Sequence, residues 1–232
     1  MRKCLFSVAM VGLIAGCCSI CAEPKTDEGW VDLFNGKDFT NFRAYKYDAA
    51  PTNGWSVQDG VIAFAGNKCK AGDLRTRLAY SNFELMFDFK ISPKGNSGVK
   101  YLVWDVKKGY PVGCEYQVLD DFSHPDAKHG RDGNRKTASL YDVIAAPADK
   151  PLNPIGQWNT GRIVVNGPVV QHWLNGVKVV EFNRESSEFD AMVAKSKFAK
   201  EKMFAKAKEG YITFQDHDDP VWYRNIKIRE LH

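Results

Sequence analysis

The sequence has little net charge and no basic cluster. Its 232 residues carry a formal net charge of +4 at pH 7. Loss of an N-terminal segment containing Arg2 and Lys3, but no acidic residue, would lower this charge by two, to +2. No basic run alternates with aromatic residues, so the composition excludes a dedicated nucleic-acid-binding protein. Internal repeats and low-complexity stretches are also absent, and the length suits one large domain.

Cysteine is scarce beyond the N-terminus. Of the six cysteines, only Cys69 and Cys114 follow residue 22. Neither belongs to a CxxC or Cys/His spacing, which excludes the common zinc-binding patterns. In an exported protein the two can form a disulfide or remain as buried free thiols, because sequence alone does not say how close their Cα atoms lie.

The N-terminus reads as an export signal. Residues 1–22 begin with basic side chains, continue as an apolar run and end in small residues, with polar sequence directly after. "IAGC" resembles a bacterial lipobox, which would make Cys17 the acylated first residue, whereas "SICA" suits ordinary cleavage before Glu23. An uncleaved anchor is a third alternative. We favour the lipobox, and expect a periplasmic or outer-membrane lipoprotein of a Gram-negative bacterium, with a tether over residues 23–29 and one domain over residues 30–232.

Short alternating runs separated by turn residues occupy most of the chain. The predicted strands are "GVIAFAG", "NFELMFDFKI", "GVKYLVWDV", "GCEYQVLD", "GRIVVNG", "VVQHWLNGVKVVEF", "GYITFQD" and "WYRNIKIREL". Asn175-Gly176 between apolar flanks predicts a type I′ hairpin, since both central residues of that turn need positive φ. This pattern is typical of an all-β sandwich of two antiparallel sheets.

The segment from Ser187 to Gly210 has a different periodicity. Its apolar residues recur at roughly helical spacing with lysines between them, and Gly210 provides a stop. This pattern predicts one or two short amphipathic helices that pack beside the sandwich.

Strand parity separates apolar from polar side chains. In "GCEYQVLD", Tyr116 and Val118 share one face, while Glu115 and Gln117 share the other. The expected core set is Val99, Tyr101, Val103, Cys114, Tyr116, Val118, Ile212, Phe214, Ile226 and Ile228. The opposite faces would carry Lys100, Leu102, Trp104, Glu115, Gln117, Gln215 and His217. This mixture of rings, amides and charges suits either a sugar site or a solvated face.

Eight stretches of the sequence, taken in order, are similar to one family. They are "VDLFNGKDFTNF", "NSGVKY", "GCEYQVLDD", "HPDAKHG", "GNRKTASLYDVI", "GQWNTGRIVV", "HWLNGVKVVEF" and "QDHDDPVWYRNIKIREL". Together they resemble the bacterial 3-keto-disaccharide hydrolases from about Trp30 to Leu231. The resemblance implies a concanavalin or laminin-G-like jelly roll that cleaves 3-keto-glycosides. One departure is Asp218, which stands where the family usually has glycine.

The resemblance also implies a chemistry. A 3-keto group acidifies the C2 hydrogen, so a base can remove it and the C1 substituent can leave by β-elimination, with water adding afterwards. Glu115 and His217 are the candidates for base and acid, and Lys100 or a divalent metal for stabilising the enolate. Because Asp218 adds a negative charge beside His217 and thereby favours its acid role, we expect Glu115 to be the base.

Further residues are candidates for binding. The expected substrate contacts are Asn96, Trp104, Gln117, Arg135, Tyr141, His172 and Gln215, and the expected metal ligands are Asp120, Asp121 and His124. No organic cofactor is expected, while the identity of any metal and the oligomeric state are open. Each residue has a structural alternative: Glu115 can pair with Lys100 across two strands, His172 can be a packing residue, and the two aspartates can form an ordinary turn or a calcium loop.

Two other functions fit the pattern less well. A non-catalytic carbohydrate-binding domain can use the same fold. A retaining glycosidase needs two carboxyl groups about 5 Å apart. Such enzymes carry Glu-x-Asp-x-x-Glu on this fold, and Gln117 occupies the place of the aspartate. The sequence therefore favours a carbohydrate substrate cleaved by elimination, with membrane contact only through a lipid anchor.

Overall fold

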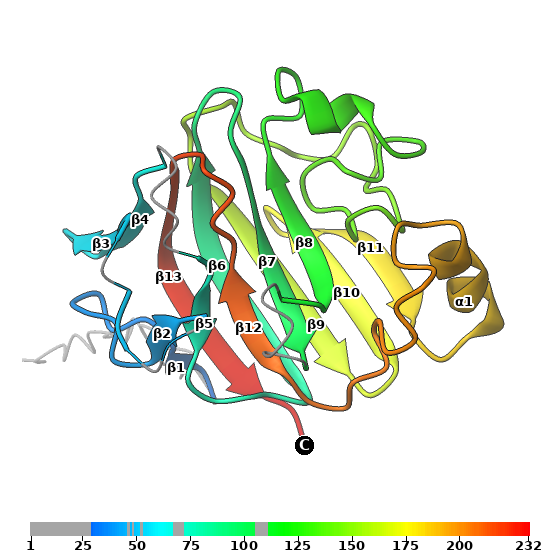
Figure 1. The fold of residues 1–232 in the computed structure, drawn as a ribbon, viewed down its shortest axis with the longest axis horizontal. Coiled ribbons are helices and arrows are strands. Elements are labelled where there is room, and N and C mark those ends of the chain that lie inside the picture. Colours follow the sequence, from blue (N-terminus) through cyan, green and yellow to red (C-terminus); the bar gives the residue numbers. More distant parts are fainter. Residues whose placement is uncertain (1–28, 46, 48, 52, 67–71, 105–110) are drawn as a thin grey trace, which may run out of the picture.

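A computed structural model describes residues 29–45, 47, 49–51, 53–66, 72–104 and 111–232. Over these residues the chain is an all-β sandwich of two antiparallel sheets with one α-helix (Figure 1), as the sequence predicts. The export signal, the lipobox, Cys69 and all but the last residue of the tether lie outside the described residues. No helix within the described part is long and apolar enough to cross a membrane.

Each of the eight predicted runs forms one or two strands. In chain order the elements are β1 (Val31–Asp32), β2 (Phe42–Ala44), β3 (Trp55–Gln58), β4 (Val61–Phe64), β5 (Leu74–Thr76), β6 (Phe83–Ile91), β7 (Asn96–Val103), β8 (Cys114–Leu119), the 3-10 turn η1 (Pro125–Lys128), β9 (Asn159–Asn166), β10 (Val169–Leu174), β11 (Val177–Asn183), α1 (Ser187–Ala194), β12 (Tyr211–Phe214) and β13 (Val221–Glu230). The strands missed by sequence reasoning are β1, β2, β3 and β5, which are too short to show a clear alternation.

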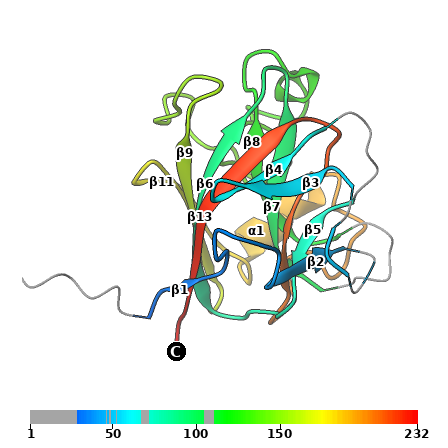
Figure 2. The ribbon, with the colours of Figure 1, turned by 90° about the vertical axis from the view of Figure 1, so that its left-hand side faces the viewer.

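The strands divide into a larger and a smaller sheet. The eight-stranded sheet has the order β11-β10-β9-β6-β13-β4-β3, with β1 beside β13, and the five-stranded sheet has the order β2-β5-β12-β7-β8. Figure 2 shows β9, β6 and β13 in one layer, with β2 and β5 across from them. The helix α1 lies beside the sandwich, at the end away from β3 and β4 (Figure 1).

The core lies between the two sheets and is rich in aromatic rings. Phe87 of the larger sheet packs edge-on against Tyr116 and Phe214 of the smaller one, with ring centroids 5.4 and 6.4 Å apart. Fully or almost fully buried residues of the expected set are Val99, Tyr101, Val103, Cys114, Tyr116, Val118, Ile212, Phe214, Ile226 and Ile228. All of these residues except Val103 belong to the core cluster, so the predicted registers are correct apart from the end of β7.

One register prediction is wrong beyond Tyr101. Leu102 has a φ of 52° and marks a bulge in β7, where the pairing with β12 shifts. A bulge reverses the faces of the residues that follow. Leu102 accordingly joins the core cluster and Trp104 packs against it, whereas the Cγ2 of Val103 lies beside Gly113. Trp104 is thus turned away from the polar face on which the sequence predicts it.

The hairpin and the helix follow their local signals. Asn175 and Gly176 have φ values of 47° and 84°, as the predicted type I′ turn between β10 and β11 requires. The predicted helical segment forms a single helix, whose N-cap Ser186 accepts a hydrogen bond from the Phe189 backbone N–H (3.2 Å). The ring of Phe189 stacks on Phe182, with centroids 4.9 Å apart. This stacking pins α1 to β11.

His172 lies inside the core, away from any sugar site. It is fully buried, with Nδ1 3.0 Å from the Ala138 carbonyl oxygen and Nε2 2.8 Å from the Tyr101 hydroxyl. Because a carbonyl only accepts, Nδ1 carries the proton, and Nε2 of the neutral ring accepts from Tyr101. Burial lowers the pKa of His172 to about 4. Cys114, nearby in the core, is a buried free thiol.

We predict that His172 makes the protein less stable in weak acid. Between pH 6.5 and about 4 the unfolded chain binds a proton at this histidine while the folded chain does not, so stability falls as the pH falls through that window. Urea unfolding of the wild type and His172→Gln should show the wild type losing roughly 2 to 3 kcal/mol more than the variant between pH 7 and 4.5. A stability difference that stays constant with pH would contradict the assignment.

Candidate functional site

The outer face of the five-stranded sheet holds a pocket of about 290 Å³. Its walls come from the strands β7 and β8, the segment directly before β8, and the loops that follow β8, β12 and α1. The lining residues are Asn96, Lys100, Pro111, Val112, Gly113, Glu115, Gln117, Tyr141, Lys197, Phe198, Glu201, Gln215 and His217. The structure thus brings together seven of the residues predicted for catalysis or substrate binding.

Strand register explains why the polar side chains meet. Lys100 of β7 is the direct partner of Glu115 of β8, and Gly98 is the direct partner of Gln117. Thr213 of β12 lies opposite Lys100 on its other side. Residues in register on neighbouring strands point to the same face. Alternation therefore puts the core residues on the inner face and this polar row on the outer one.

The Glu115 side chain folds over Gly98. A Cβ atom at position 98 would lie 2.5 Å from Glu115 Oε1 and 3.1 Å from its Cδ, closer than any normal contact. Within the described residues the Glu115 carboxylate has no hydrogen bond and no ion pair, and Lys100 does not approach it within 4.0 Å. The residue itself is only 6% exposed. A nearly buried carboxylate thus faces the pocket with its oxygens available.

Lys100 pairs with a different carboxylate. Its ammonium lies 3.6 Å from Oδ2 of Asp73, and both side chains are almost completely buried. Burial raises the pKa of Asp73, although the positive charge of Lys100 opposes that rise. The carboxylate of Asp73 therefore partly neutralises the positive charge of Lys100. Lys100 pairs with Asp73 and not with Glu115, the partner considered as a structural alternative from the sequence.

His217 lies at the exposed rim of the pocket. Its Nε2 is 3.4 Å from Asn96 Nδ2, and the Asn96 backbone N–H donates to Asp219 (3.0 Å). The next residue, Asp218, has a φ of 64°, the left-handed conformation that glycine adopts most readily. Its backbone N–H donates to Asp216 Oδ1 (3.1 Å). The turn thus keeps a glycine-like backbone despite the aspartate.

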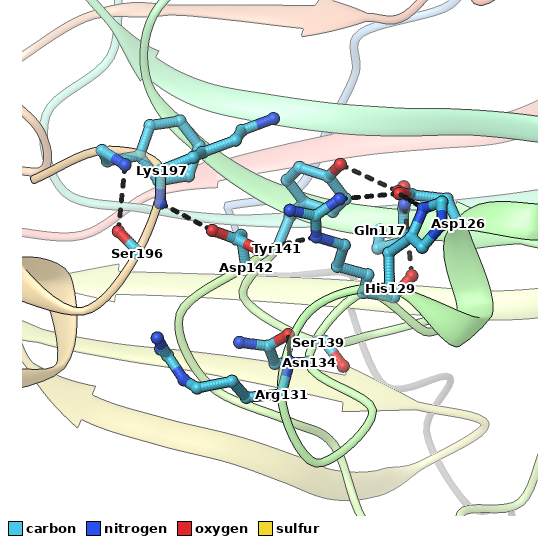
Figure 3. Close-up of polar contacts among 12 residues, drawn as sticks. Gln117, Asp126, His129, Arg131, Asn134, Ser139, Tyr141, Asp142, Ser196 and Lys197 are labelled. Atoms are coloured by element: carbon cyan, nitrogen blue, oxygen red, sulfur yellow. Dashed lines mark hydrogen bonds and ion pairs between the residues drawn. The ribbon is translucent and has the colours of Figure 1, made fainter.

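Tyr141 forms one wall through a buried network, shown in Figure 3. Its hydroxyl donates to Asp126 Oδ2 (2.8 Å). Arg135 donates from Nη1 to Asp126 Oδ1 (2.8 Å) and from Nε to Asp142 Oδ1 (2.6 Å). Burial and the bond to Asp126 raise the pKa of Tyr141, so the phenol stays protonated. Arg135 does not line the pocket; it positions the two aspartates that hold this wall.

Two hydrogen bonds fix the amide group of Gln117 at the floor of the pocket. Its Nε2 donates to the Arg135 carbonyl oxygen (3.3 Å), and its Oε1 accepts from the Val118 backbone N–H (3.1 Å). Gln215 enters the same floor from the end of β12, where its backbone N–H donates to Gly98 (2.9 Å). Two amide side chains therefore lie on either side of Gly98, the position that the Glu115 carboxylate covers.

Sequence reasoning missed the segment after α1. The pocket is also lined by Lys197, Phe198 and Glu201, although the periodicity of this segment predicts a helix that packs beside the sandwich. The helix ends at Ala194, and the Lys197 backbone N–H donates to Asp142 Oδ2 (2.7 Å). Lysines between apolar residues are common on solvated helix faces, so no local signal distinguishes these residues.

The three expected metal ligands have separate structural partners. Asp120 accepts from the backbone N–H groups of Lys94, Phe122 and Ser123. Asp121 accepts from the Thr137 backbone N–H and forms an ion pair with Lys150 (both 2.7 Å). His124 Nδ1 accepts from the Asp126 backbone N–H (3.1 Å). Among the described residues no group of three or more His, Cys, Asp or Glu side chains could hold a metal ion. In the structure these three side chains brace the loop that carries Tyr141.

Comparison with known proteins gives consistent matches. A family model described as a 3-keto-alpha-glucoside-1,2-lyase-like domain matches residues 29–229. A 3-keto-disaccharide hydrolase of Bacteroides thetaiotaomicron is 36% identical over 90% of this chain and 80% of its own length. Two crystal structures of candidate glycosyl hydrolases from Parabacteroides distasonis are also similar. One has a TM-score of 0.77 and 31% identity, covering 88% of this chain and 95% of its own; the other has 0.65 and 29%, covering 87% and 99%.

We predict that Gly98 is required because of Glu115. In Gly98→Ala the new methyl group must displace the Glu115 side chain, so unfolding measurements should show a loss of about 1 to 3 kcal/mol. In a Glu115→Ala background the same change should cost close to nothing, because the three nearest atoms all belong to Glu115. An equal cost in both backgrounds would show that another contact demands the glycine.

Proposed function

The chain belongs to the 3-keto-alpha-glucoside-1,2-lyase-like family, and we propose that its pocket cleaves 3-keto-glycosides by elimination of the C1 substituent. The activity in the relative's name supports a carbohydrate-cleaving enzyme. The observation that carries the finer proposal is the Glu115 carboxylate, which is nearly buried, faces the pocket and has no partner among the described residues.

The proposed reaction begins at C2 of the sugar. The carbonyl at C3 acidifies the neighbouring C2–H bond, so a carboxylate can remove that proton. The electron pair of the C–H bond then moves to the C3 oxygen as an enolate. When the carbonyl re-forms, a C1=C2 double bond appears and the C1–O bond breaks. Water then adds at C1 and a proton returns to C2, which completes a net hydrolysis.

Glu115 is suited to the role of base. A general base must reach the proton it removes and must not be engaged by other donors. The carboxylate over Gly98 meets both conditions within the described residues. Lys100, its cross-strand neighbour, offers positive charge for the enolate oxygen, and its pairing with Asp73 fixes that charge in place. No step here requires a metal.

The remaining polar groups suit sugar hydroxyls. Three amide side chains line the pocket: Asn96 of β7, Gln117 of β8 and Gln215, which directly follows β12. Tyr141 contributes an aromatic wall. Amides pair with hydroxyl groups, and rings pack on the apolar face of a sugar. The Oδ1 atom of Asn96 and the Oε1 atom of Gln215 are buried and have no hydrogen-bond partner among the residues that the structure describes. We infer that these two oxygens accept hydrogen bonds from substrate hydroxyls.

Export and lipid anchoring remain proposals. They rest on residues 1–22 of the sequence, which lie outside the described residues. A periplasmic or outer-membrane site would give the enzyme access to oxidised sugars outside the cytoplasm, with the domain held at the membrane through an acylated Cys17.

We predict that Glu115→Gln slows cleavage of a 3-keto-glucoside by about 100- to 10,000-fold, the usual contribution of a general base. The amide has nearly the same shape as the carboxylate, so the thermal midpoint should change little. Product release from 3-keto and unoxidised forms of the same glucoside, followed by chromatography, provides the measurement. The exposed Glu185→Gln is the matched control and should retain wild-type rates.

The same assay separates the alternatives. Cleavage of the keto form alone by the wild type supports elimination. Cleavage of both forms would indicate a conventional glycosidase, and binding without cleavage would indicate a carbohydrate-binding domain. Full activity of Glu115→Gln on the keto form would remove Glu115 from the role of base.

A further inference from the structure

The pocket contains two lysines in different electrostatic states. The Lys100 ammonium is ion-paired with Asp73 at 3.6 Å. The Lys197 ammonium, within the described residues, has no carboxylate within ion-pair distance. It lies over the ring of Tyr141, 4.1 Å from the centroid, and 5.1 Å from that of Phe198. Lys197 therefore presents to the pocket a cation that forms no ion pair within the described part of the chain.

Hydrogen bonds hold the segment that carries Lys197 against the loop after β8. Asp142 joins the two, because its Oδ2 accepts from the Lys197 backbone N–H (2.7 Å) while its Oδ1 accepts from Arg135. A second link runs from Arg131 Nη1 to the Lys195 carbonyl oxygen. Figure 3 shows the bond between Asp142 and the Lys197 backbone beside Tyr141. The base of the lysine is thus fixed by several bonds, and only its side chain remains free to adjust.

The surroundings of the Lys197 ammonium lower its pKa. Desolvation in the pocket lowers the pKa of Lys197, and the negative charge of Glu115 is the largest opposing influence. Lys197 is an exposed residue overall, so this desolvation concerns its ammonium end between the rings and the pocket wall. Lys197 and the proposed base Glu115 line the same pocket.

We propose that Lys197 is the catalytic acid that protonates the leaving oxygen, a role that rests on the elimination proposed above. As the C1–O bond breaks, its electron pair goes to the departing oxygen, which takes a proton from the Lys197 ammonium. The lysine is then neutral, and Glu115 holds the C2 proton. In the hydration step the water that adds to C1 gives a proton to Lys197, and Glu115 returns one to C2. Both groups end in their starting states.

His217 is the competing donor. It lines the pocket at its exposed rim, where Asn96 is its hydrogen-bond neighbour. Both residues are exposed overall, but the Lys197 ammonium lies over the rings of Tyr141 and Phe198, which shield one side of it from water. This difference favours Lys197 as the acid and leaves His217 a contact at the rim.

Leaving groups of different basicity test the proposal. We predict that Lys197→Met slows cleavage of methyl 3-keto-glucoside by at least about 100-fold, because methoxide must be protonated to depart. The same variant should slow the nitrophenyl 3-keto-glucoside by less than about 10-fold, because nitrophenoxide leaves as a stable anion. Glu115→Gln should slow both substrates alike, and the exposed Lys200→Met should slow neither.

Further variants separate proton donation from charge. Lys197→Arg keeps the positive charge but is a poor acid, so it should remain slow on the methyl substrate. Equal losses of Lys197→Met on both substrates, or recovery in Lys197→Arg, would overturn the acid role. So would a His217→Asn variant with the selective loss on the methyl substrate. Failure of the wild type on both keto substrates would instead overturn the proposed function, and this proposal with it.

Discussion

Antiparallel pairing of β7 with β8 and β12 is the constraint on which the site depends. The strand register pairs Lys100 with Glu115 and Gly98 with Gln117 on the outer face. The residues that alternate with them, Val99 and Tyr116, point inward and belong to the core. A slip of one residue would exchange the two faces and bury the charges between the sheets. The packing of Tyr116 against Phe87 in the opposite sheet therefore stabilises both the fold and the arrangement of the polar groups in the pocket.

The second requirement is a set of loops that closes the pocket over this face. Partly or fully buried ion pairs, together with backbone hydrogen bonds, hold these loops: Asp126 and Asp142 bind Arg135, and Asp121 binds Lys150. Removing one partner of such a pair leaves a buried charge unbalanced, which is costly. The aspartates predicted as metal ligands thus serve the site indirectly, by fixing the wall that carries Tyr141.

The sequence predicted the parts of the fold that have a local pattern. Alternation identified the long strands, the inner and outer faces of β8, and the Asn175-Gly176 turn. It failed at Leu102, because a bulge with positive φ has no signature in a run of apolar residues. For His172 the sequence left two alternatives, a sugar contact or a packing residue. The structure supports packing, because Tyr101 and Ala138 bond to its ring inside the core.

The site was predictable to the extent that it lies on strands. Strand parity predicts that four polar side chains share one face, because paired residues on neighbouring strands point to the same side of the sheet. These are Lys100, Glu115, Gln117 and Gln215. Lys197 and Phe198 lie about 80 residues further along the chain than Glu115. They are held at the pocket by the bond from the Lys197 backbone to Asp142 and by the bond from Arg131 to the Lys195 carbonyl oxygen. Such a contact joins two irregular segments, and neither has a periodicity from which the contact could be inferred.

The most direct test of the account is the position of hydrogen in the product. With the wild type and a 3-keto-glucoside in D₂O, elimination followed by hydration must return a proton to C2 from Glu115, whose carboxyl opens to the pocket and exchanges with solvent. NMR should therefore find deuterium at C2 of the released sugar, or an unsaturated sugar with no C2 hydrogen, at levels above those of 3-keto-glucose incubated without enzyme. A released sugar that keeps its original C2 hydrogen would contradict elimination and, with it, the assignment of this face as the site of proton removal.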